Sequence, residues 1–327
     1  MKAPCVRVSR EEGERTRHRL AEQDLIDHRY RIHADDGSVY IPITLREAVP
    51  AEFEITEREV ERRSKDTLPR DFLEEPPSYE RLGEIALIDE DDPARAREVA
   101  DALMDSTLPI RAVLNRASKI KGTERVREWE VLAGDRTETI HREFGVEFVV
   151  DVTEVYFSPR LATERHRVVS QIQDGEHVFD MFAGVGPFLI PAVIQGAVGV
   201  GVDINPIAIE YLEKNAARNG VSDRITAIND DVRTIAPDYG GWADRLIMNL
   251  PHSADDFLEA AGTIAGDRCR LHYYDIQPDA APFDPGREAI LKAFGTEYDV
   301  EFINEHVVRS YAPHEVNVCL DVLITLS

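Results

Sequence analysis

The spacing of apolar residues changes near residue 167 of this 327-residue chain. Beyond that point, short apolar runs alternate with amphipathic stretches, one of which begins at Pro206 and ends before Gly220. Apolar runs of about four to eight residues between turn residues are typical of buried strands. Strands that alternate with helices predict a parallel sheet with helices on both faces. We therefore expect an α/β fold, with a helix at 206–219 and strands at 178–180, 197–203, 225–228, 245–249 and 270–274.

The chain before residue 167 predicts two smaller α/β units. The first has a charged helix within 10–27 and the hairpin turn signal Asp35-Asp36-Gly37-Ser38, with short strands at 6–8, 30–32 and 39–41. A polar, proline-containing segment separates it from a second unit, for which we expect a helix at 93–104 and strands at 84–88, 109–114 and 144–155. The predicted parts are a small N-terminal domain (1–54), a linker (55–78), a middle domain (79–166) and the larger domain (167–327).

Composition limits the class of protein. The hydrophobic fraction of 43% is that of a globular chain, and no apolar stretch approaches the length of a membrane helix. Residues 1–10 lack the apolar core of a secretory signal. We therefore expect a soluble, cytoplasmic protein without a membrane partner. Cys5, Cys269 and Cys319 lack metal-site spacing, which fits a reducing compartment and predicts no metal site.

The formal net charge is -24. Such a charge normally argues against a nucleic-acid partner, because phosphates require a positive surface. Only six of the 38 basic residues are lysine, however, and an acidic, lysine-poor composition indicates adaptation to a saline cytoplasm. There the Debye length is about 3 Å at 1 M salt, so charges are strongly screened. An ordinary acidic protein is the alternative.

One stretch, residues 111–127, is locally basic, with six basic side chains and a single acid, Glu124. In so acidic a chain this excess predicts a strip that binds phosphate groups, although part of it would be solvated surface in any protein. The strip comprises Arg111, Arg116, Lys119, Lys121, Arg125 and Arg127.

A glycine-rich loop, Asp180-Met181-Phe182-Ala183-Gly184-Val185-Gly186-Pro187-Phe188, follows the first strand of the larger domain. Its two glycines let the backbone approach a ligand closely, and the helix start that follows favours an anionic group. Such a loop also suits a nicotinamide dinucleotide, but the glycine spacing differs from that pattern. We therefore predict S-adenosylmethionine as the cofactor of a methyltransferase.

Polar residues at the ends of the next strands extend this site. Asp203 ends the second strand, where a carboxylate can accept hydrogen bonds from ribose hydroxyls. Asp230-Asp231-Val232 follows the third strand, where an adenine edge would lie. Each Asp alone could be a helix cap, but their recurrence favours a cofactor site. Asn249-Leu250-Pro251 ends the fourth strand and could present oxygens to a planar base or simply form a turn.

These residues resemble the archaeal and eukaryotic tRNA (guanine-37 N1)-methyltransferase family over essentially the whole chain. The most specific segment is 155–165, Val-Tyr-Phe-Ser-Pro-Arg-Leu-Ala-Thr-Glu-Arg. Further matching segments lie at 11–17, 118–122, 125–128, 132–134, 139–141, 249–251, 272–274 and 310–313. The composition indicates a haloarchaeal member.

The resemblance implies a class I, Rossmann-like methyltransferase domain with a mainly parallel seven-stranded sheet, preceded by two smaller α/β domains. The N-terminal domain would contact the outer corner of tRNA, the middle domain would help hold the anticodon loop, and the protein would be a monomer. S-adenosylmethionine would be held by Asp180, Phe182, Ala183, Gly184, Val185, Gly186, Asp203, Ile204, Asn205, Asp231, Val232 and Asn249.

The resemblance also implies the catalytic residues. In the family, a Glu in S-P-R-L-x-x-E-R and an Arg in G-x-x-R-x-R carry the chemistry, which assigns these roles to Glu164 and Arg125, with Arg127 as the alternative. Glu164 would remove the proton from guanine N1, and Arg125 would stabilise the negative charge that grows on O6. Without the resemblance, both would be interpreted as solvated surface residues. The guanine pocket would include Tyr156, Asn249 and Pro251.

Alternative functions remain open. A wybutosine-pathway transferase would use the same cofactor at the same tRNA position but transfer an aminocarboxypropyl group, and a tricyclic guanine derivative could be the methyl acceptor. A non-catalytic RNA-binding protein is disfavoured by Glu164, and a nicotinamide dehydrogenase by the loop pattern. The sequence therefore predicts methyl transfer to N1 of guanine 37 in tRNA.

Overall fold

The structure is a computed structural model that describes residues 2–23, 25–27, 29–35, 37–50, 52–61, 67–117 and 128–327. The chain separates into two compact units, Met1–Leu68 and Pro69–Ser327. No helix in these described ranges is long and apolar enough to cross a membrane.

The smaller unit is an antiparallel sheet with one helix, α1 (Gly13–Glu22). Its strands lie in the order β2-β3-β1-β4 and are β1 (Lys2–Ser9), β2 (His33–Ala34), β3 (Ser38–Pro42) and β4 (Glu54–Glu59). Leu20 of the helix packs against Val6 and Ile41 of the sheet. The predicted linker starts too early, because β4 pairs with β1 along its length. The strand predicted at 30–32 lies at β2 instead.

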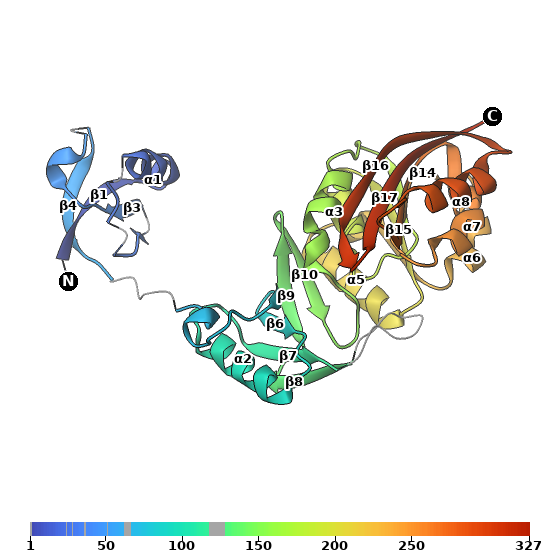
Figure 1. The fold of residues 1–327 in the computed structure, drawn as a ribbon. Helices are drawn as coiled ribbons and strands as arrows, with labels where there is room; N and C mark the ends of the chain where they lie inside the picture. Colours follow the sequence, from blue (N-terminus) through green and yellow to red (C-terminus); the bar gives the residue numbers. More distant parts are fainter. Residues whose placement is uncertain are drawn as a thin grey trace. The chain divides into compact units, whose positions relative to one another are not determined.

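The larger unit begins with a four-stranded sheet and one helix, α2 (Pro93–Asp105). The strands, in spatial order, are β5 (Tyr79–Leu82), β6 (Ile85–Ile88), β7 (Ala112–Arg116) and β8 (Trp129–Ala133). Val99 and Leu103 of the helix pack against Ile88 and Val113, so the helix covers one face of this sheet (Figure 1). The strand predicted at 109–114 corresponds to β7, which begins later, at Ala112, and ends later, at Arg116.

A hairpin of β9 (Glu138–Glu143) and β10 (Val146–Asp151) follows. The strand predicted at 144–155 is thus shorter, because residues 144 and 145 form the turn. Asn215 fixes the hairpin to the next domain, since its side-chain amide accepts from the Val149 amide at 2.7 Å and donates to the Val149 carbonyl at 3.1 Å. Phe148 enters the same core as Leu189 and Leu212.

The remaining chain forms a seven-stranded sheet in the order β13-β12-β11-β14-β15-β17-β16. Neighbouring strands from β13 to β15 are parallel, and β17 is antiparallel to both β15 and β16. The predicted mainly parallel, seven-stranded sheet is confirmed, with β17 as the reversed strand. The strands are β11 (His177–Asp180), β12 (Val198–Asp203), β13 (Ile225–Asn229), β14 (Ala243–Met248), β15 (Ala265–Pro278), β16 (Tyr298–Ala312) and β17 (Glu315–Leu326).

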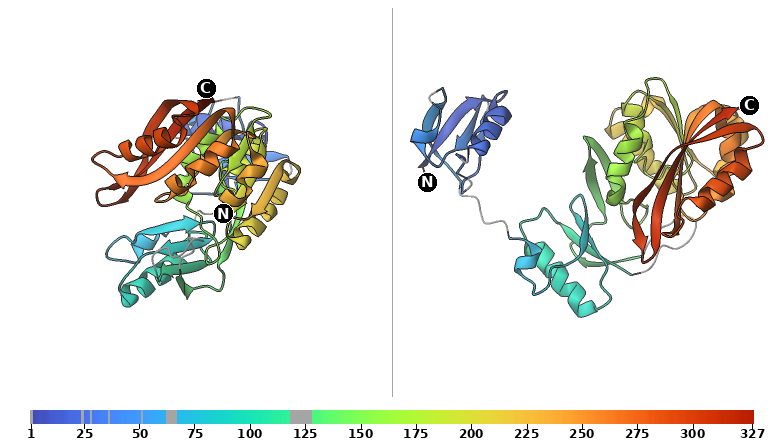
Figure 2. Two further views of the ribbon diagram at one scale, coloured as in Figure 1. Left: turned by 90° about the vertical axis from the view of Figure 1, so that its right-hand side faces the viewer. Right: turned by 45° about the horizontal axis from the view of Figure 1, so that its top comes forward.

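Helices cover both faces of this sheet because its strands are apolar on both sides, as expected for parallel strands. Val178 and Phe179, adjacent in β11, enter separate cores on the two faces. One core contains residues of α3 (Ala162–Val169), α4 (Leu189–Ile194) and α5 (Pro206–Arg218). The other contains residues of α6 (Val232–Ile235), α7 (Leu258–Ile264) and α8 (Asp284–Phe294). Figures 1 and 2 show α3 and α8 on opposite sides of β15 and β17.

Candidate active site

The loops after β11, β12, β13 and β14 line one cavity of about 670 Å³, together with the segment before α3. Strand order reverses between β11 and β14, and ligands bind at such switch points in open α/β sheets. The structure therefore brings most of the predicted cofactor and pocket residues together. The lining includes Tyr156, Phe182, Ala183, Gly184, Asp203, Ile204, Asn205, Asp231, Val232, Asn249 and Pro251.

Three predicted cofactor residues lie behind this lining. Val185 is buried in the core, and Gly186 has a φ of +87°, where a Cβ would lie 2.5 Å from Leu212. Asp180 is buried, and its Oδ1 accepts a hydrogen bond from the Phe182 amide at 3.3 Å. Burial raises the pKa of Asp180 to about 7. These three buried residues therefore support the loop without lining the cavity. The Oδ2 of Asp180 has no hydrogen-bond partner among the described residues.

Asp203 joins two of the strand ends. Its Oδ2 accepts from the Gly184 amide at 2.8 Å, and its Oδ1 accepts from the Asn205 amide at 2.9 Å. Asn205 caps α5 and donates to the Glu154 carbonyl at 2.9 Å. The glycine loop, the end of β12 and the segment after β10 are thereby held at one edge of the cavity.

Two aromatic rings also line the cavity. Phe257 and Phe182 meet edge to face, with centroids 4.9 Å apart, and the Arg233 guanidinium lies 4.7 Å from the Phe257 centroid. Arg233 also pairs with Asp231, the cap of α6. Sequence reasoning missed Phe257 and Arg233, and the local sequence around Phe257 carries no signal for this role. An apolar slot edged by carboxylates can hold a planar heterocycle with exocyclic donors.

Glu164 lies beside this cavity but is not in its lining. Its carboxylate is buried and accepts four hydrogen bonds, of which Arg167 donates two, at 2.8 and 2.9 Å. Tyr274 donates to Oε1 at 2.6 Å, and Nε2 of His306 lies 2.9 Å from Oε2. Burial disfavours the charge, but the hydrogen bonds from Arg167, His306 and Tyr274 outweigh it and lower the pKa of Glu164 to about 2.

A buried ion-pair network holds Arg167 in turn. Arg167 donates to Asp321 at 2.6 and 3.1 Å, and Asp321 lies 2.5 Å from Nδ1 of His272. Nη1 of Arg245 lies 2.7 Å from Nε2 of the same imidazole. Because a guanidinium can only donate, the His272 ring accepts at Nε2 and donates from Nδ1. Burial lowers the pKa of His272, which favours this neutral form.

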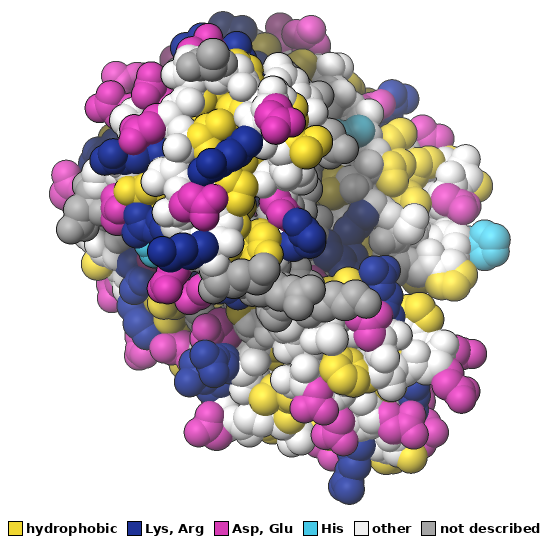
Figure 3. Space-filling view, turned by 90° about the vertical axis from the view of Figure 1, so that its left-hand side faces the viewer, with side chains coloured by type: hydrophobic (Ala, Val, Ile, Leu, Met, Phe, Trp, Pro, Cys, Tyr) yellow, Lys and Arg dark blue, Asp and Glu magenta, His cyan; other side chains and the backbone are white. Residues whose placement is uncertain are grey.

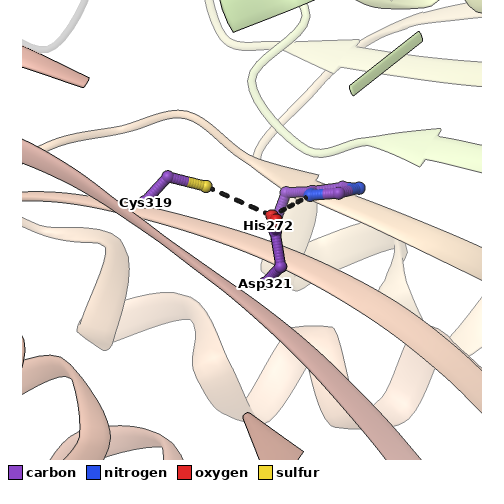
Figure 4. A group of neighbouring side chains, drawn as sticks. All are labelled: His272, Cys319 and Asp321. Atoms are coloured by element: carbon purple, nitrogen blue, oxygen red, sulfur yellow. Dashed lines mark hydrogen bonds and ion pairs between the residues drawn. The ribbon is translucent and has the colours of Figure 1, made fainter. Parts of the chain in front are cut away.

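His272, Cys319 and Asp321 have the residue types of a metal site, with ligand atoms within 4.8 Å of one another (Figure 4). Their potential ligand atoms are already in use, however, and two guanidinium groups, Arg167 and Arg245, contact the cluster. Burial raises the pKa of the Cys319 thiol, so it stays protonated. A divalent cation would have to displace these bonds against two positive charges, and we interpret the cluster as structural.

Register places Glu164 close to the Asn249 turn. Met248, the last residue of β14, pairs with Tyr273 of β15, so Asn249 and Tyr274 follow side by side. Tyr274 is the residue that donates to Glu164. Leu161 and Arg165, in the same segment as Glu164, line the cavity together with Asn249.

The predicted phosphate strip is only partly described. Lys119, Lys121, Arg125 and Arg127 lie outside the described residues. Arg111 is exposed, and Arg116 forms an ion pair with Asp89. Among the described side chains on the face drawn in Figure 3, Lys and Arg are interspersed with Asp and Glu. The catalytic role of Arg125 and the phosphate strip stay predictions.

Three family models match successive parts of the chain. The tRNA methyltransferase 5 N-terminal domain matches residues 5–48, the TYW2 N-terminal domain matches 61–137, and the TRM5/TYW2 methyltransferase domain matches 139–303.

Curated relatives match almost the whole chain. The chain is 39% identical to tRNA (guanine(37)-N(1))-methyltransferase Trm5b of Pyrococcus abyssi, over 97% of this chain and 98% of the relative. The crystal structure of that Trm5b has a TM-score of 0.72 and 38% identity and covers 99% of this chain and 100% of its own. A complex of aTrm5 with tRNALeu has a TM-score of 0.71 and 34% identity, covering 98% and 99%. By these matches, the chain belongs to the TRM5/TYW2 methyltransferase family.

Proposed function

We propose that this protein transfers a methyl group from S-adenosylmethionine to N1 of guanine 37 in tRNA. The observation that carries the proposal is that the Glu164 segment and the Asn249 turn meet at one cavity. Leu161 and Arg165 line the same cavity as Asn249, and Glu164 is bonded to Tyr274 on the adjoining strand. The relatives named for guanine-37 N1 methylation match nearly the whole chain and support the same reaction.

The residues present fit S-adenosylmethionine. Asp203 lines the cavity at the end of β12, where a carboxylate can accept hydrogen bonds from ribose hydroxyls. The adenine would lie against Ile204 and Phe257, with Asp231 at its edge. The bound cofactor supplies a methyl group activated by a positively charged sulfur. Among the relatives, a Trm5 of Methanocaldococcus jannaschii was solved with adenosine.

Glu164 needs one rearrangement to act as a base. A carboxylate with four donors and a pKa of about 2 holds a proton poorly, and it has no free lone-pair site for the N1–H. His306 comes from the edge strand β16 and contributes a single hydrogen bond, whereas Arg167 contributes two and is itself held by Asp321. When the guanine N1–H replaces His306 at Oε2, the proton to be removed lies in a direct hydrogen bond to the carboxylate that accepts it. The N1–H bond then breaks toward Oε2, and the electron pair on N1 becomes available to the methyl carbon.

Asn249 and Arg125 complete the proposed guanine site. Asn249 directly follows β14 and would orient the guanine edge, with Pro251 and Tyr156 on the cavity wall. Arg125, assigned by resemblance, would stabilise the negative charge that develops on O6 as N1 loses its proton. Asn249, Pro251 and Tyr156 would mainly position N1 for transfer.

A second function, transfer of an aminocarboxypropyl group, is favoured by the matches to relatives of that activity. A tRNA(Phe) (4-demethylwyosine(37)-C(7)) aminocarboxypropyltransferase of Pyrococcus horikoshii is 32% identical over 80% of this chain, and a TYW2 model matches 61–137. Mass analysis of the modified nucleoside separates the two reactions. A gain of one methyl group on guanosine supports the proposal, and a gain of an aminocarboxypropyl group contradicts it.

A further inference from the structure

The hairpin of β9 and β10 closes on an unusual pair of turn residues. Glu143 pairs directly with Val146, so Phe144 and Gly145 alone form the turn. Both have positive φ, +46° and +86°, which is the geometry of a type I′ turn. The first position of that turn favours Asn, Asp or Gly, and a bulky residue there is a backbone outlier. Phe144 therefore occupies a position that its side chain disfavours.

Core packing does not compensate for this conformation. Phe144 is 64% exposed. Its ring stacks on His166 of α3, with centroids 4.3 Å apart and planes at 15°, and His166 is itself exposed. The two rings form a flat, exposed pair, which we call the Phe144/His166 platform.

The platform is joined to the candidate active site by one buried ion pair. Glu143, next to Phe144, accepts two hydrogen bonds from Arg165, next to His166. Arg165 lines the cavity, and its guanidinium lies 5.0 Å from the centroid of Phe157, which also lines it. Figure 1 shows the hairpin tip rising alongside α3. The platform thus lies just outside the cavity wall.

Charged side chains beside the hairpin tip suit an RNA more than an apolar protein surface. Arg142 and Arg218 both pair with Glu147, while Glu143 pairs with Arg165 and Glu138 with Lys214. The Arg142 side chain is 68% exposed. Exposed aromatic rings beside guanidinium groups are the usual means by which proteins hold unpaired bases.

We infer that the Phe144/His166 platform stacks an unpaired nucleobase of the tRNA substrate, outside the cavity that takes the target guanine. The inference rests on the proposed function, which supplies an RNA whose target base leaves the stack. Stacking on the platform would hold a neighbouring base and thereby lower the cost of presenting the guanine. No covalent step is involved.

Phe144→Asn tests the platform because it removes the ring and installs a residue that the turn favours. We expect an unchanged or higher melting temperature, unchanged cofactor affinity and a roughly 10-fold weaker Kd for an anticodon stem-loop RNA at fixed salt, by analogy with base–aromatic stacking elsewhere. Phe144→Tyr keeps the ring and should bind RNA as the unmodified protein does. His166→Ala should weaken binding in the same direction.

Two results would overturn the platform: RNA affinity of Phe144→Asn equal to that of the unmodified protein, or weaker binding that accompanies a lower melting temperature and is not reproduced by His166→Ala. The second would mean that the ring only supports the fold. Because RNA binding is measured without turnover, the outcome is independent of the reaction. If no methyl group reaches guanine 37 but Phe144→Asn still binds RNA more weakly, the platform stands and the proposed function fails.

Discussion

At the scale of single residues, the proposed mechanism depends most on Glu164. Its segment is recognisable in the sequence, but its partners are not, because Tyr274 and His306 come from strands far along the chain. Local pattern locates residues at strand ends, such as Asp203, since all parallel strands end at one edge. Local sequence does not predict hydrogen bonds that form only when α3 packs on β15 and β16.

Glu164→Gln keeps the size of the side chain but removes the base. We expect turnover to fall about 100-fold or more, as for loss of a general base, with cofactor affinity kept, because Glu164 is not in the cavity lining. Single-turnover methylation measures the turnover, and calorimetry measures the cofactor affinity. Glu288→Gln, at an exposed site on α8, is the control. A variant with normal turnover at several pH values would remove Glu164 from the mechanism.

Asp180 should make stability pH-dependent in the cofactor-free protein. Burial raises its pKa to about 7, so the folded state keeps a proton that the unfolded state releases near its ordinary value. Stability is therefore lost as pH rises from about 4 to about 7. At about 1.4 kcal/mol per pH unit, the loss reaches a few kcal/mol. Urea unfolding at pH 5 and pH 8 measures it, and Asp180→Asn should lack this loss. Parallel pH dependence in both proteins would contradict the assignment.

At the scale of elements, apolar periodicity predicts the buried strands well and the exposed ones poorly. β11 and β12 lie within one residue of the predicted bounds, because they are buried, largely apolar and followed by turn signals. β4 was assigned to the linker, since its sequence Glu-Ile-Thr-Glu-Arg-Glu is mostly polar and it lies at a sheet edge. The hairpin turn at 144–145 was missed because Phe144 is not a turn residue.

The glycine loop offers a matched pair of substitutions. Gly186→Ala would place a Cβ 2.5 Å from Leu212 at a φ of +87°, whereas at Gly184 (φ +52°) nothing lies closer than 4.0 Å. We expect Gly186→Ala to lower the free energy of unfolding by about 3 kcal/mol through overpacking and strain. Gly184→Ala should cost about 1–2 kcal/mol through strain alone. Denaturant unfolding of both variants tests the order, and equal losses would contradict the packing argument.

At the scale of the whole molecule, the net charge of -24 makes stability depend on salt concentration. Like charges repel across the surface, and salt screens them once the Debye length falls to about 3 Å near 1 M. We propose a protein adapted to high salt and expect its melting temperature to rise between about 0.1 and 2 M KCl. A melting temperature that stays constant or falls over this range would contradict the saline interpretation.

The most direct test of the central claim is methyl transfer in molar salt from labelled S-adenosylmethionine to two tRNA transcripts that differ only at position 37. We expect the transcript with guanine at 37 to gain one methyl group, recovered as N1-methylguanosine, and the transcript with adenine to gain none. Equal labelling of both transcripts, or label recovered in another nucleoside, would contradict it.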